Sequence, residues 1–397
     1  GGLGRHVHAL SVALAGAGHQ VTVVTRHAPG APLEEYADGV RIVRAPEDPP
    51  LFPLATPSLL GWAMAFNHTL TRAALRAART GEYDVVHAHD WLVAHAAVTV
   101  RDHLDIPLVA TVHATESGRH QGWLPHAHNR TIDDIERWLC AEAVRVIVCS
   151  EYMRAEVGRL FDVPADRTDV VFNGVDVLRW YARPRAVAAA RLRFAAAGAP
   201  LVTYAGRLVY EKGVQHLLAA VPQLRDRHPG LRVVIAGDGP YRADLEAQAG
   251  DEVTFAGFLG GHDLTALMGA SDCYVVPSIY EPFGMVALEA AAAGTPVAVA
   301  DTGGLAEIVD HGVTGVKFPS QDPSALAASV SAVLGDKDYA RALARRARRR
   351  VREEFAWPGI AAQTVAVYRA AAAHEAGAVA RAAQLLVDAA HRQSLHT

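Results

Sequence analysis

Residues 273–300 read CYVVPSIYEPFGMVALEAAAAGTPVAVA, and this stretch contains a strand, a helix and a second strand. Cys273–Val276 and Val297–Ala300 are short apolar runs, typical of strands that are buried on both faces. Between them, Met285–Ala293 has no helix breaker and is followed by Gly294, so we expect a helix that ends at the glycine. Two strands joined by a helix form a parallel pair, and the stretch therefore predicts an α/β fold.

The same alternation continues on both sides of this stretch. Apolar runs separated by segments of helical length predict further strands at 21–24, 40–43, 84–87, 108–112, 146–149, 170–172, 201–204, 232–236, 253–255 and 315–318. Residues 177–199 interrupt this alternation of strands and helices, because they are rich in Arg, Ala and Pro. We expect two doubly wound, Rossmann-like domains whose facing sheets form a cleft. Their predicted bounds are 1–176 and 200–355, with a linker at 177–199 and a returning helix and tail at 356–397.

Composition excludes several classes of protein. A length of 397 residues fits two domains, and 51% hydrophobic with 20% charged residues excludes a disordered chain. The formal net charge of -4 gives no overall basic field for nucleic acid or an anionic membrane, and no apolar run approaches the ~20 residues of a membrane span. Three cysteines without metal-ligand spacing favour a reducing compartment, so we expect a cytoplasmic protein.

The chain begins Gly1-Gly2-Leu3-Gly4, directly before a helical pattern that starts at Arg5. Backbone amides of such a loop could face an anion at the helix N-terminus, but a tight turn before a helix accounts for the same residues equally well. A strand precedes a loop of this kind in a βαβ unit, whereas here there is neither a strand nor an initiator Met. We therefore expect that an interior strand is missing and that the chain is unstable or inactive without it.

A second candidate loop, AGRLVYEKG at 205–213, follows the predicted strand 201–204. Arg207 can bind phosphate oxygens in bidentate fashion and Lys212 adds a compact charge, which suits a diphosphate leaving group. An exposed loop with an ordinary charge pair between Glu211 and Lys212 is the alternative interpretation.

Glu281 and Glu289 flank the start of the helix predicted at 285–293. Pro282 and Gly284 keep Glu281 in a loop, while Glu289 lies about one turn inside the helix. Amides at this helix end suit phosphate, and the carboxylates suit sugar or ribose hydroxyls. The alternatives are a hydrolase acid and base, whose carboxyls would lie about 5 to 9.5 Å apart, or two structural glutamates.

Histidines mark the ends of two strands predicted in the first domain. His87 and His89 share one face of an extended segment and Asp90 does not, which favours a polar site over a metal site. His113 is the stronger candidate, because its strand ends beside it. Loop 116–130, which contains Trp123, suits carbohydrate as well as a plain surface loop.

Seven arginines lie between Arg341 and Arg352. A patch that binds phosphate or lipid is one interpretation of this run. An Ala- and Arg-rich helix with a solvated face is favoured, and we assign no chemistry to it.

These motifs together resemble the retaining glycosyltransferases of family 4, which have the two-domain GT-B fold of bacterial glycogen synthases. The resemblance covers roughly residues 1–368 and rests on Glu281-x7-Glu289, Gly206-Arg207, Lys212, the N-terminal GGLG and His113. In GGLGRHVH, VVHAHDWLVAH and HATESGRH the chain is most similar to actinobacterial glycogen-synthase-like enzymes that extend α-1,4-glucans.

The resemblance implies a role for each matching residue. Arg207 and Lys212 would hold the donor diphosphate, and His113 would contact the transferred sugar near its anomeric centre. Glu289 would bind the ribose, and Glu281 would bind the donor sugar. The remaining donor contacts would come from backbone or loop positions: Phe283, Gly284, Met285 and Val286 at the helix start, Gly2 and Gly4 from the other domain, and Gly237, Asp238, Phe258 and Leu259 around the base.

The resemblance also implies a reaction. A hexose, with glucose expected, would move with retention from UDP-glucose or ADP-glucose to an α-1,4-glucan, and the departing phosphate would take the acceptor proton. Family members use no metal or other cofactor, and their last helix crosses back to the first domain. Other readings stay open: transfer to a lipid, a small glycoside or phosphate, a non-catalytic nucleotide-sugar binder, and a sugar-nucleotide epimerase.

Overall fold

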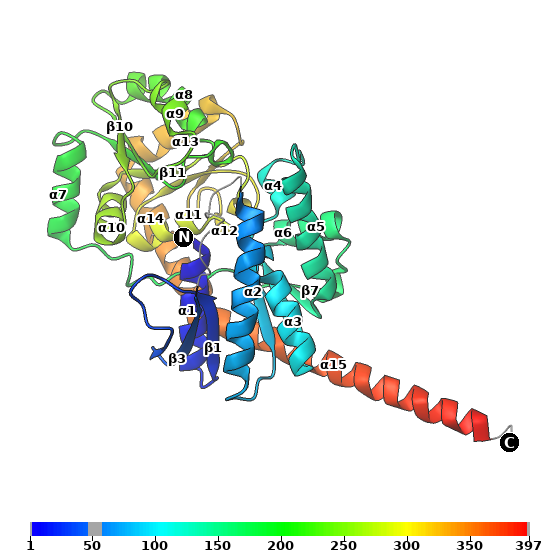
Figure 1. The fold of residues 1–397 in the computed structure, drawn as a ribbon. Helices are drawn as coiled ribbons and strands as arrows, with labels where there is room; N and C mark the ends of the chain where they lie inside the picture. Colours follow the sequence, from blue (N-terminus) through cyan, green and yellow to red (C-terminus); the bar gives the residue numbers. More distant parts are fainter. Residues whose placement is uncertain (1, 47–57, 395–397) are drawn as a thin grey trace.

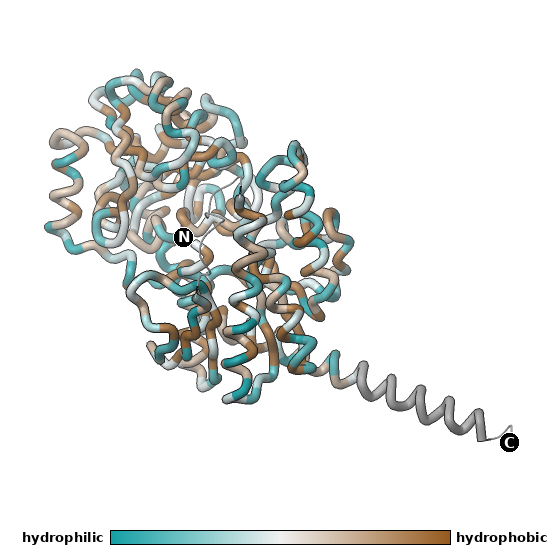
Figure 2. The backbone as a smooth tube through the Cα atoms, in the orientation of Figure 1, coloured by the Kyte–Doolittle hydropathy of each residue, from teal (hydrophilic) through white to brown (hydrophobic). Residues whose placement is uncertain are grey.

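The structure is a computed structural model that describes residues 2–46 and 58–394, with side chains through residue 377. It consists of two α/β units, joined by residues after β7 and again by the last helix (Figure 1). Apolar segments concentrate in the interior of both units (Figure 2). Among the described residues, no helix is both long and apolar enough to cross a membrane.

The second unit contains one six-stranded sheet. All its neighbouring strands are parallel, in the order β10-β9-β8-β11-β12-β13. Its strands are β8 (Leu201–Ala205), β9 (Arg232–Ala236), β10 (Val253–Gly257), β11 (Cys273–Val276), β12 (Val297–Ala300) and β13 (Val316–Phe318). Because the strand order reverses between β8 and β11, ligands are expected beyond the carboxyl ends of these two strands.

Helices cover both faces of this sheet. They are α8 (Val214–Arg227), α9 (Arg242–Glu246), α10 (Gly261–Ala270), α11 (Met285–Ala293), α12 (Leu305–Ile308), α13 (Pro323–Gly335) and α14 (Lys337–Glu354), with a 3-10 turn at Tyr210–Lys212. The predicted bounds of α11 are confirmed, and Gly294 ends it in the left-handed conformation with φ 86°. The buried side of α14 contains Leu343, Ala347 and Val351, so most of its arginines lie on the opposite, solvated face.

The first unit differs from the single parallel sheet that the sequence predicts. It holds a four-stranded parallel sheet, β4-β5-β6-β7, and a separate sheet, β1-β3-β2. The strands are β1 (Val21–Arg26), β2 (Glu34–Ala37), β3 (Val40–Ala45), β4 (Val86–His89), β5 (Leu108–Val112), β6 (Arg145–Val148) and β7 (Thr168–Val170). No described strand pairs with both β1 and β4, and β2 pairs antiparallel to β3.

Helices alternate with strands after β3, as predicted, whereas the segment between β1 and β3, where a helix was expected, contains β2 instead. The helices of the first unit are α1 (Gly2–Gly16), α2 (Leu59–Ala78), α3 (Ala94–Leu104), α4 (Glu116–Arg119), α5 (Ala127–Glu142) and α6 (Glu151–Phe161), with 3-10 turns at Trp91–Val93 and Ala165–Arg167. The expected glycine loop is wrong for Gly2 and Gly4, because α1 already begins at Gly2; Gly1 lies outside the described residues. Glycine is a weak helix former but occurs in helices, so the glycines did not distinguish a loop from the first turn of a helix.

Two further segments connect the units. The linker expected at 177–199 contains a helix, α7 (Pro184–Phe194), which begins with Pro at a position where its missing N–H costs nothing. The last helix, α15 (Trp357–Ser394), contacts α1, β5 and β6 of the first unit and then extends away from the body (Figure 1). Its Ile360 and Ala361 are buried in one apolar cluster with Leu10 of α1.

Candidate active site

Loops that follow β8 and β9 are hydrogen-bonded to each other beyond the sheet. Leu208 N donates to Asp238 O at 2.9 Å, and Tyr241 N donates to Leu208 O at 3.0 Å. Gly237 has φ 141°, and a Cβ there would lie 1.8 Å from Gly206 O. Only glycine permits this approach, so the predicted diphosphate loop and the predicted base loop are held side by side.

Lys212 and Glu281 meet where the loops after β8 and β11 converge. The Lys212 Nζ donates to Glu281 Oε2 at 2.7 Å, and Ser278 Oγ donates to the same oxygen at 3.2 Å. Glu281 is 9% exposed, so this ion pair is shielded from water. A Cβ at Gly213 would lie 1.9 Å from Pro277 O, which shows how tightly the two loops pack. The pair thus presents one fixed cation and one fixed carboxylate at the switch point of the sheet.

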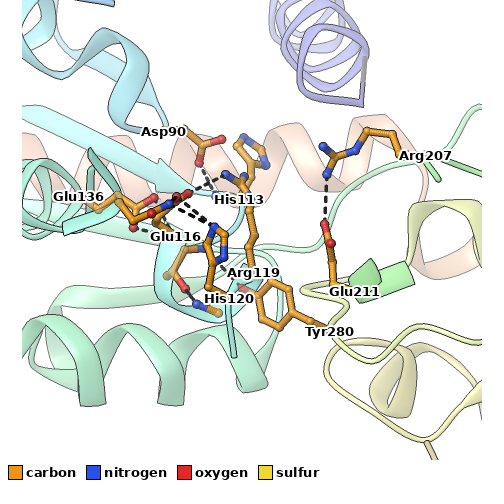
Figure 3. Close-up of polar contacts among 12 residues, drawn as sticks. Asp90, His113, Glu116, Arg119, His120, Glu136, Arg207, Glu211 and Tyr280 are labelled. Atoms are coloured by element: carbon orange, nitrogen blue, oxygen red, sulfur yellow. Dashed lines mark hydrogen bonds and ion pairs between the residues drawn. The ribbon is translucent and has the colours of Figure 1, made fainter. Parts of the chain in front are cut away.

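Arg207 stands at the outer side of the same loop. Its guanidinium lies 3.8 Å from the Glu211 carboxylate and is largely exposed (Figure 3). Glu211 itself is anchored, because its carbonyl oxygen accepts from Ile279 N at 2.9 Å. A long, exposed guanidinium of this kind is free to turn toward an anion that enters beside Lys212.

The start of α11 is shaped by a glycine and by a buried aromatic ring. Gly284 precedes the helix with φ 106°, and a Cβ there would lie 2.5 Å from the side chain of Leu305. Phe283 is buried against Phe172 and so fixes the loop, with ring centroids 5.8 Å apart. The N–H groups of the first turn, which includes Met285 and Val286, have no acceptor inside the helix and favour negative charge.

Glu289 pairs with Arg5 of the other unit. Its Oε1 lies 3.0 Å from Arg5 Nη2, and its side chain is almost completely buried. Burial raises the pKa of Glu289 to about 7, while Arg5 and then Arg179 pull it down. Arg5 was not among the residues predicted for the site. The only available signal was a basic residue directly after the glycines at the start of a helix.

His113 lies at the end of β5 with two polar neighbours. Its backbone N donates to Asp90 Oδ1 at 2.8 Å, and its Nε2 is 3.1 Å from His89 Nδ1. Burial, followed by the nearby Arg119 charge, lowers the pKa of His113 to about 4, so the imidazole is neutral at pH 7. Asp90 has φ 60° and a pKa raised to about 6 by burial. His113 is therefore a neutral hydrogen-bonding group, held by its backbone.

A buried polar cluster holds α4 beside His113 (Figure 3). Both carboxylate oxygens of Glu136 accept from Glu116 N, at 2.9 and 3.1 Å, and Asn129 Nδ2 donates to Glu116 Oε1 at 2.6 Å. Arg119 lies 3.8 Å from Glu116. Burial raises the pKa of Glu136 to about 8, so this carboxyl is mostly protonated at pH 7. From the sequence, Glu116 was noted only as part of a motif, and Glu136 was not predicted to belong to the site.

Tyr280 links the two units next to this cluster. Its hydroxyl donates to Glu156 Oε1 at 2.8 Å and accepts from Thr115 N at 3.3 Å. A Cβ at Gly118 would lie 2.4 Å from the Tyr280 ring, so glycine is required for the contact. A second link is Ser150 Oγ, which donates to Pro282 O at 2.7 Å.

Other predicted donor residues lie at the periphery. Gly237 N donates to Gly257 O at 2.7 Å, which places the loops after β9 and β10 next to each other. Phe258 is 82% exposed and Leu259 is half-buried. The Asp238 carboxylate accepts from Gly239 N at 2.8 Å. These residues form an open edge, whereas Lys212, Glu281 and the start of α11 form the buried centre.

Comparisons with known proteins cover nearly the whole chain. Residues 1–179 match the family model described as Glycosyltransferase Family 4, and residues 193–350 match that described as Glycosyl transferases group 1. A glycogen synthase of Mycobacterium tuberculosis (strain ATCC 25618 / H37Rv) is 43% identical over 387 residues, covering 94% of this chain and 91% of the relative.

Two more distant matches are named for other activities. A D-inositol 3-phosphate glycosyltransferase of Nocardia farcinica (strain IFM 10152) is 34% identical and covers 87% of this chain and 80% of the relative. The structure of sucrose-phosphate synthase from Thermosynechococcus elongatus superposes with a TM-score of 0.79 at 29% identity, covering 93% of each chain.

Proposed function

This chain belongs to glycosyltransferase family 4, and we propose that it transfers glucose from a nucleotide-glucose to an α-1,4-glucan with retention of the anomeric configuration. It is a hexosyltransferase with the GT-B fold, in agreement with the expectation from its motifs. The identity to the mycobacterial glycogen synthase supports the glucan as acceptor, because it exceeds the identity to the inositol-phosphate enzyme.

The proposal rests mainly on one ion pair in the second unit. The Lys212–Glu281 ion pair lies at the switch point of the second sheet, next to the start of α11. A diphosphate at this point would receive the Lys212 ammonium, helix amides and, after a side-chain rotation, the Arg207 guanidinium. These groups act where negative charge develops as the bond between the sugar anomeric carbon and the phosphate oxygen breaks.

The acceptor hydroxyl then attacks from the face that the phosphate leaves. A bond forms between the acceptor oxygen and the anomeric carbon, and the hydroxyl proton goes to the departing phosphate oxygen. Neutral His113 is suited to hydrogen-bond the sugar without adding a second positive charge near the developing oxocarbenium ion. No side chain needs to act as a nucleophile in this scheme.

A hydrolase acid and base pair fits the residues less well. Glu281 is tied to Lys212, and Glu289 is tied to Arg5. Both carboxylates are therefore already engaged by cations, whereas a hydrolase needs two carboxyls that are free to face the scissile bond from either side. A nucleoside ribose, which offers two hydroxyl donors, is a better partner for Glu289.

We include in the proposal that transfer needs no metal or other cofactor, because Lys212, Arg207 and the helix amides supply the positive charge at the diphosphate. A cytoplasmic location is also proposed. It is supported by Cys140, Cys149 and Cys273, which are free and buried.

The proposal is tested with two donors and two acceptors in all combinations. UDP-glucose and ADP-glucose are each incubated with maltohexaose or with inositol 3-phosphate, and products are identified by mass. We expect glucose to be added to maltohexaose with at least one donor. Addition to inositol 3-phosphate alone would contradict the glucan assignment while retaining the transferase. No transfer to either acceptor by protein that melts cooperatively and binds a nucleotide-glucose would contradict the proposed reaction.

A further inference from the structure

Three histidines from separate elements converge beside the candidate active site. His6 belongs to α1, His89 ends β4, and His113 follows β5. One ring nitrogen from each can be chosen so that all three lie within 4.8 Å of one another. The ring centroids are 4.7 Å apart for His6 and His113, 5.4 Å for His89 and His113, and 5.5 Å for His6 and His89.

These distances match the geometry of a metal ion held by three imidazoles. Tetrahedral coordination with Zn–N bonds of about 2.0–2.1 Å places ligand nitrogens about 3.4 Å apart and ring centroids about 5.2 Å apart. His89 Nδ1 and His113 Nε2 are 3.1 Å apart, close to that nitrogen spacing. His6 must shift slightly to complete the triangle, and it comes from the first turns of the N-terminal helix.

The protonation state of the histidines also suits metal binding. Burial lowers the pKa of His6 to about 3 and that of His113 to about 4, so both rings are neutral and keep a lone pair at pH 7. His6 is only 8% exposed, yet its Nδ1 is buried without a hydrogen-bond partner. An unpartnered buried nitrogen costs free energy that a coordinate bond would recover.

The neighbouring His87 is excluded as a ligand. Its Nδ1 lies 2.7 Å from Tyr368 Oη, and its Nε2 lies 2.7 Å from Thr111 Oγ1. Both ring nitrogens are therefore engaged in hydrogen bonds. His87 instead packs against His89, with ring centroids 4.2 Å apart.

We propose that His6, His89 and His113 form a binding site for a divalent transition-metal ion such as Zn²⁺ or Co²⁺. Binding breaks the contact between His89 and His113, and the proton shared there moves to another ring nitrogen or to solvent. The fourth coordination position remains for water. The ion does not serve the transfer reaction: it occupies His113 and so competes with the sugar of the donor.

The site is tested by metal binding, independently of any transferase activity. Tag-free protein is titrated with Zn²⁺ by calorimetry and with Co²⁺ by visible absorption, in a buffer that does not chelate metals. We expect one equivalent to bind, with the intense d–d bands of tetrahedral Co²⁺. His6→Ala removes a ligand, and we expect at least ~100-fold weaker binding, because losing even a supporting partner of a ligand costs about 10- to 100-fold.

Two controls keep the result interpretable. His8→Ala removes an exposed histidine from the same helix and should bind as the wild type does. Thermal melts of the metal-free proteins establish that His6→Ala is folded, and His89→Ala provides a second ligand variant. The proposal is overturned if the wild type binds no Zn²⁺, if binding is unchanged in folded His6→Ala and His89→Ala, or if the Co²⁺ spectrum is octahedral.

Discussion

The Arg5 guanidinium lies 3.0 Å from the Glu289 carboxylate and joins the first helix of one domain to α11 of the other. Glu289 is the residue expected to bind the donor ribose, so this ion pair couples domain contact to the donor site. Donor binding must therefore share or replace the Arg5 contact. The pair also makes the pKa of Glu289 depend on the contact between the two units.

Donor affinity is predicted to depend on pH through Glu289. Its pKa is raised to about 7, so the carboxylate becomes ionised as pH rises through that value and accepts ribose hydroxyls more strongly. The donor KM should fall between pH 6 and 8. In Arg5→Ala the inflection should move to higher pH, because the cation that lowers the pKa is gone.

Glu289→Gln provides the control for this pH profile. The amide cannot ionise, and the KM of the variant should not show the inflection. An unchanged inflection in Glu289→Gln would assign the pH dependence to another group.

Turnover is predicted to depend on Arg207 and Lys212. Alanine at either position should lower kcat about 100-fold or more, the scale for loss of one preorganised electrostatic group. Steady-state kinetics at saturating donor measures this effect. Arg225→Ala, which removes an exposed arginine of α8, should stay within about threefold of the wild type.

Lys212→Ala needs a stability control, because it leaves the buried Glu281 carboxylate without its cation. Thermal melts of this variant and of Lys212→Ala combined with Glu281→Gln separate unfolding from lost catalysis. Near-wild-type turnover in both Arg207→Ala and Lys212→Ala would refute the role of these residues at the diphosphate.

The raised pKa of Glu136 predicts that the stability of the folded protein depends on pH. Its pKa is raised from 4.5 to about 8, so the folded protein holds a proton that the unfolded chain has released. The contribution of this group to stability is complete below pH 4.5 and is lost as pH rises through about 8. Glu136→Gln retains the neutral shape and cannot ionise. Urea unfolding should show the variant gaining stability relative to wild type between pH 5 and 9, whereas parallel curves would contradict the assignment.

Because Gly118 contacts Tyr280 closely, adding one methyl group at Gly118 is predicted to lower the stability of the protein. In Gly118→Ala the new Cβ would lie 2.4 Å from the Tyr280 ring, which must move and weaken its hydrogen bond to Glu156. We expect a loss of about 1–3 kcal/mol in the free energy of unfolding, as for overpacked cores, and a larger radius of gyration by small-angle scattering.

Gly16→Ala is the matched control, because the same methyl group there meets no atom within 4 Å. It should change the free energy of unfolding by less than about 1 kcal/mol. Equal effects of the two substitutions would show that the Tyr280 contact is unimportant.

Much of the second domain was predictable from local sequence. Continuous apolar runs predicted β9 (Arg232–Ala236) and β11 (Cys273–Val276) with the bounds found in the structure, because strands buried on both faces have no polar interruptions. The convergence of Lys212 and Glu281 was also implicit, since both follow neighbouring strands of one parallel sheet.

Features that depend on long-range placement were not predictable in the same way. The Arg5–Glu289 pair requires knowing how two domains meet, and nothing local marks Arg5 as buried beside a carboxylate. Glu136 resembles an ordinary helical surface residue until α4 covers it. The strand Glu34–Ala37 begins with two charged residues and forms an exposed antiparallel edge, so it has no apolar run to detect.

Retaining glucosyl transfer to an α-1,4-glucan can be established from the product of one reaction. The protein is incubated with maltohexaose and donor labelled at the anomeric carbon, and the new linkage is read by NMR. We predict a longer oligosaccharide whose new glucose is α-1,4-linked, and we predict that Lys212→Ala does not form this product. A β-linked product, or release of free glucose with no elongation, would contradict it.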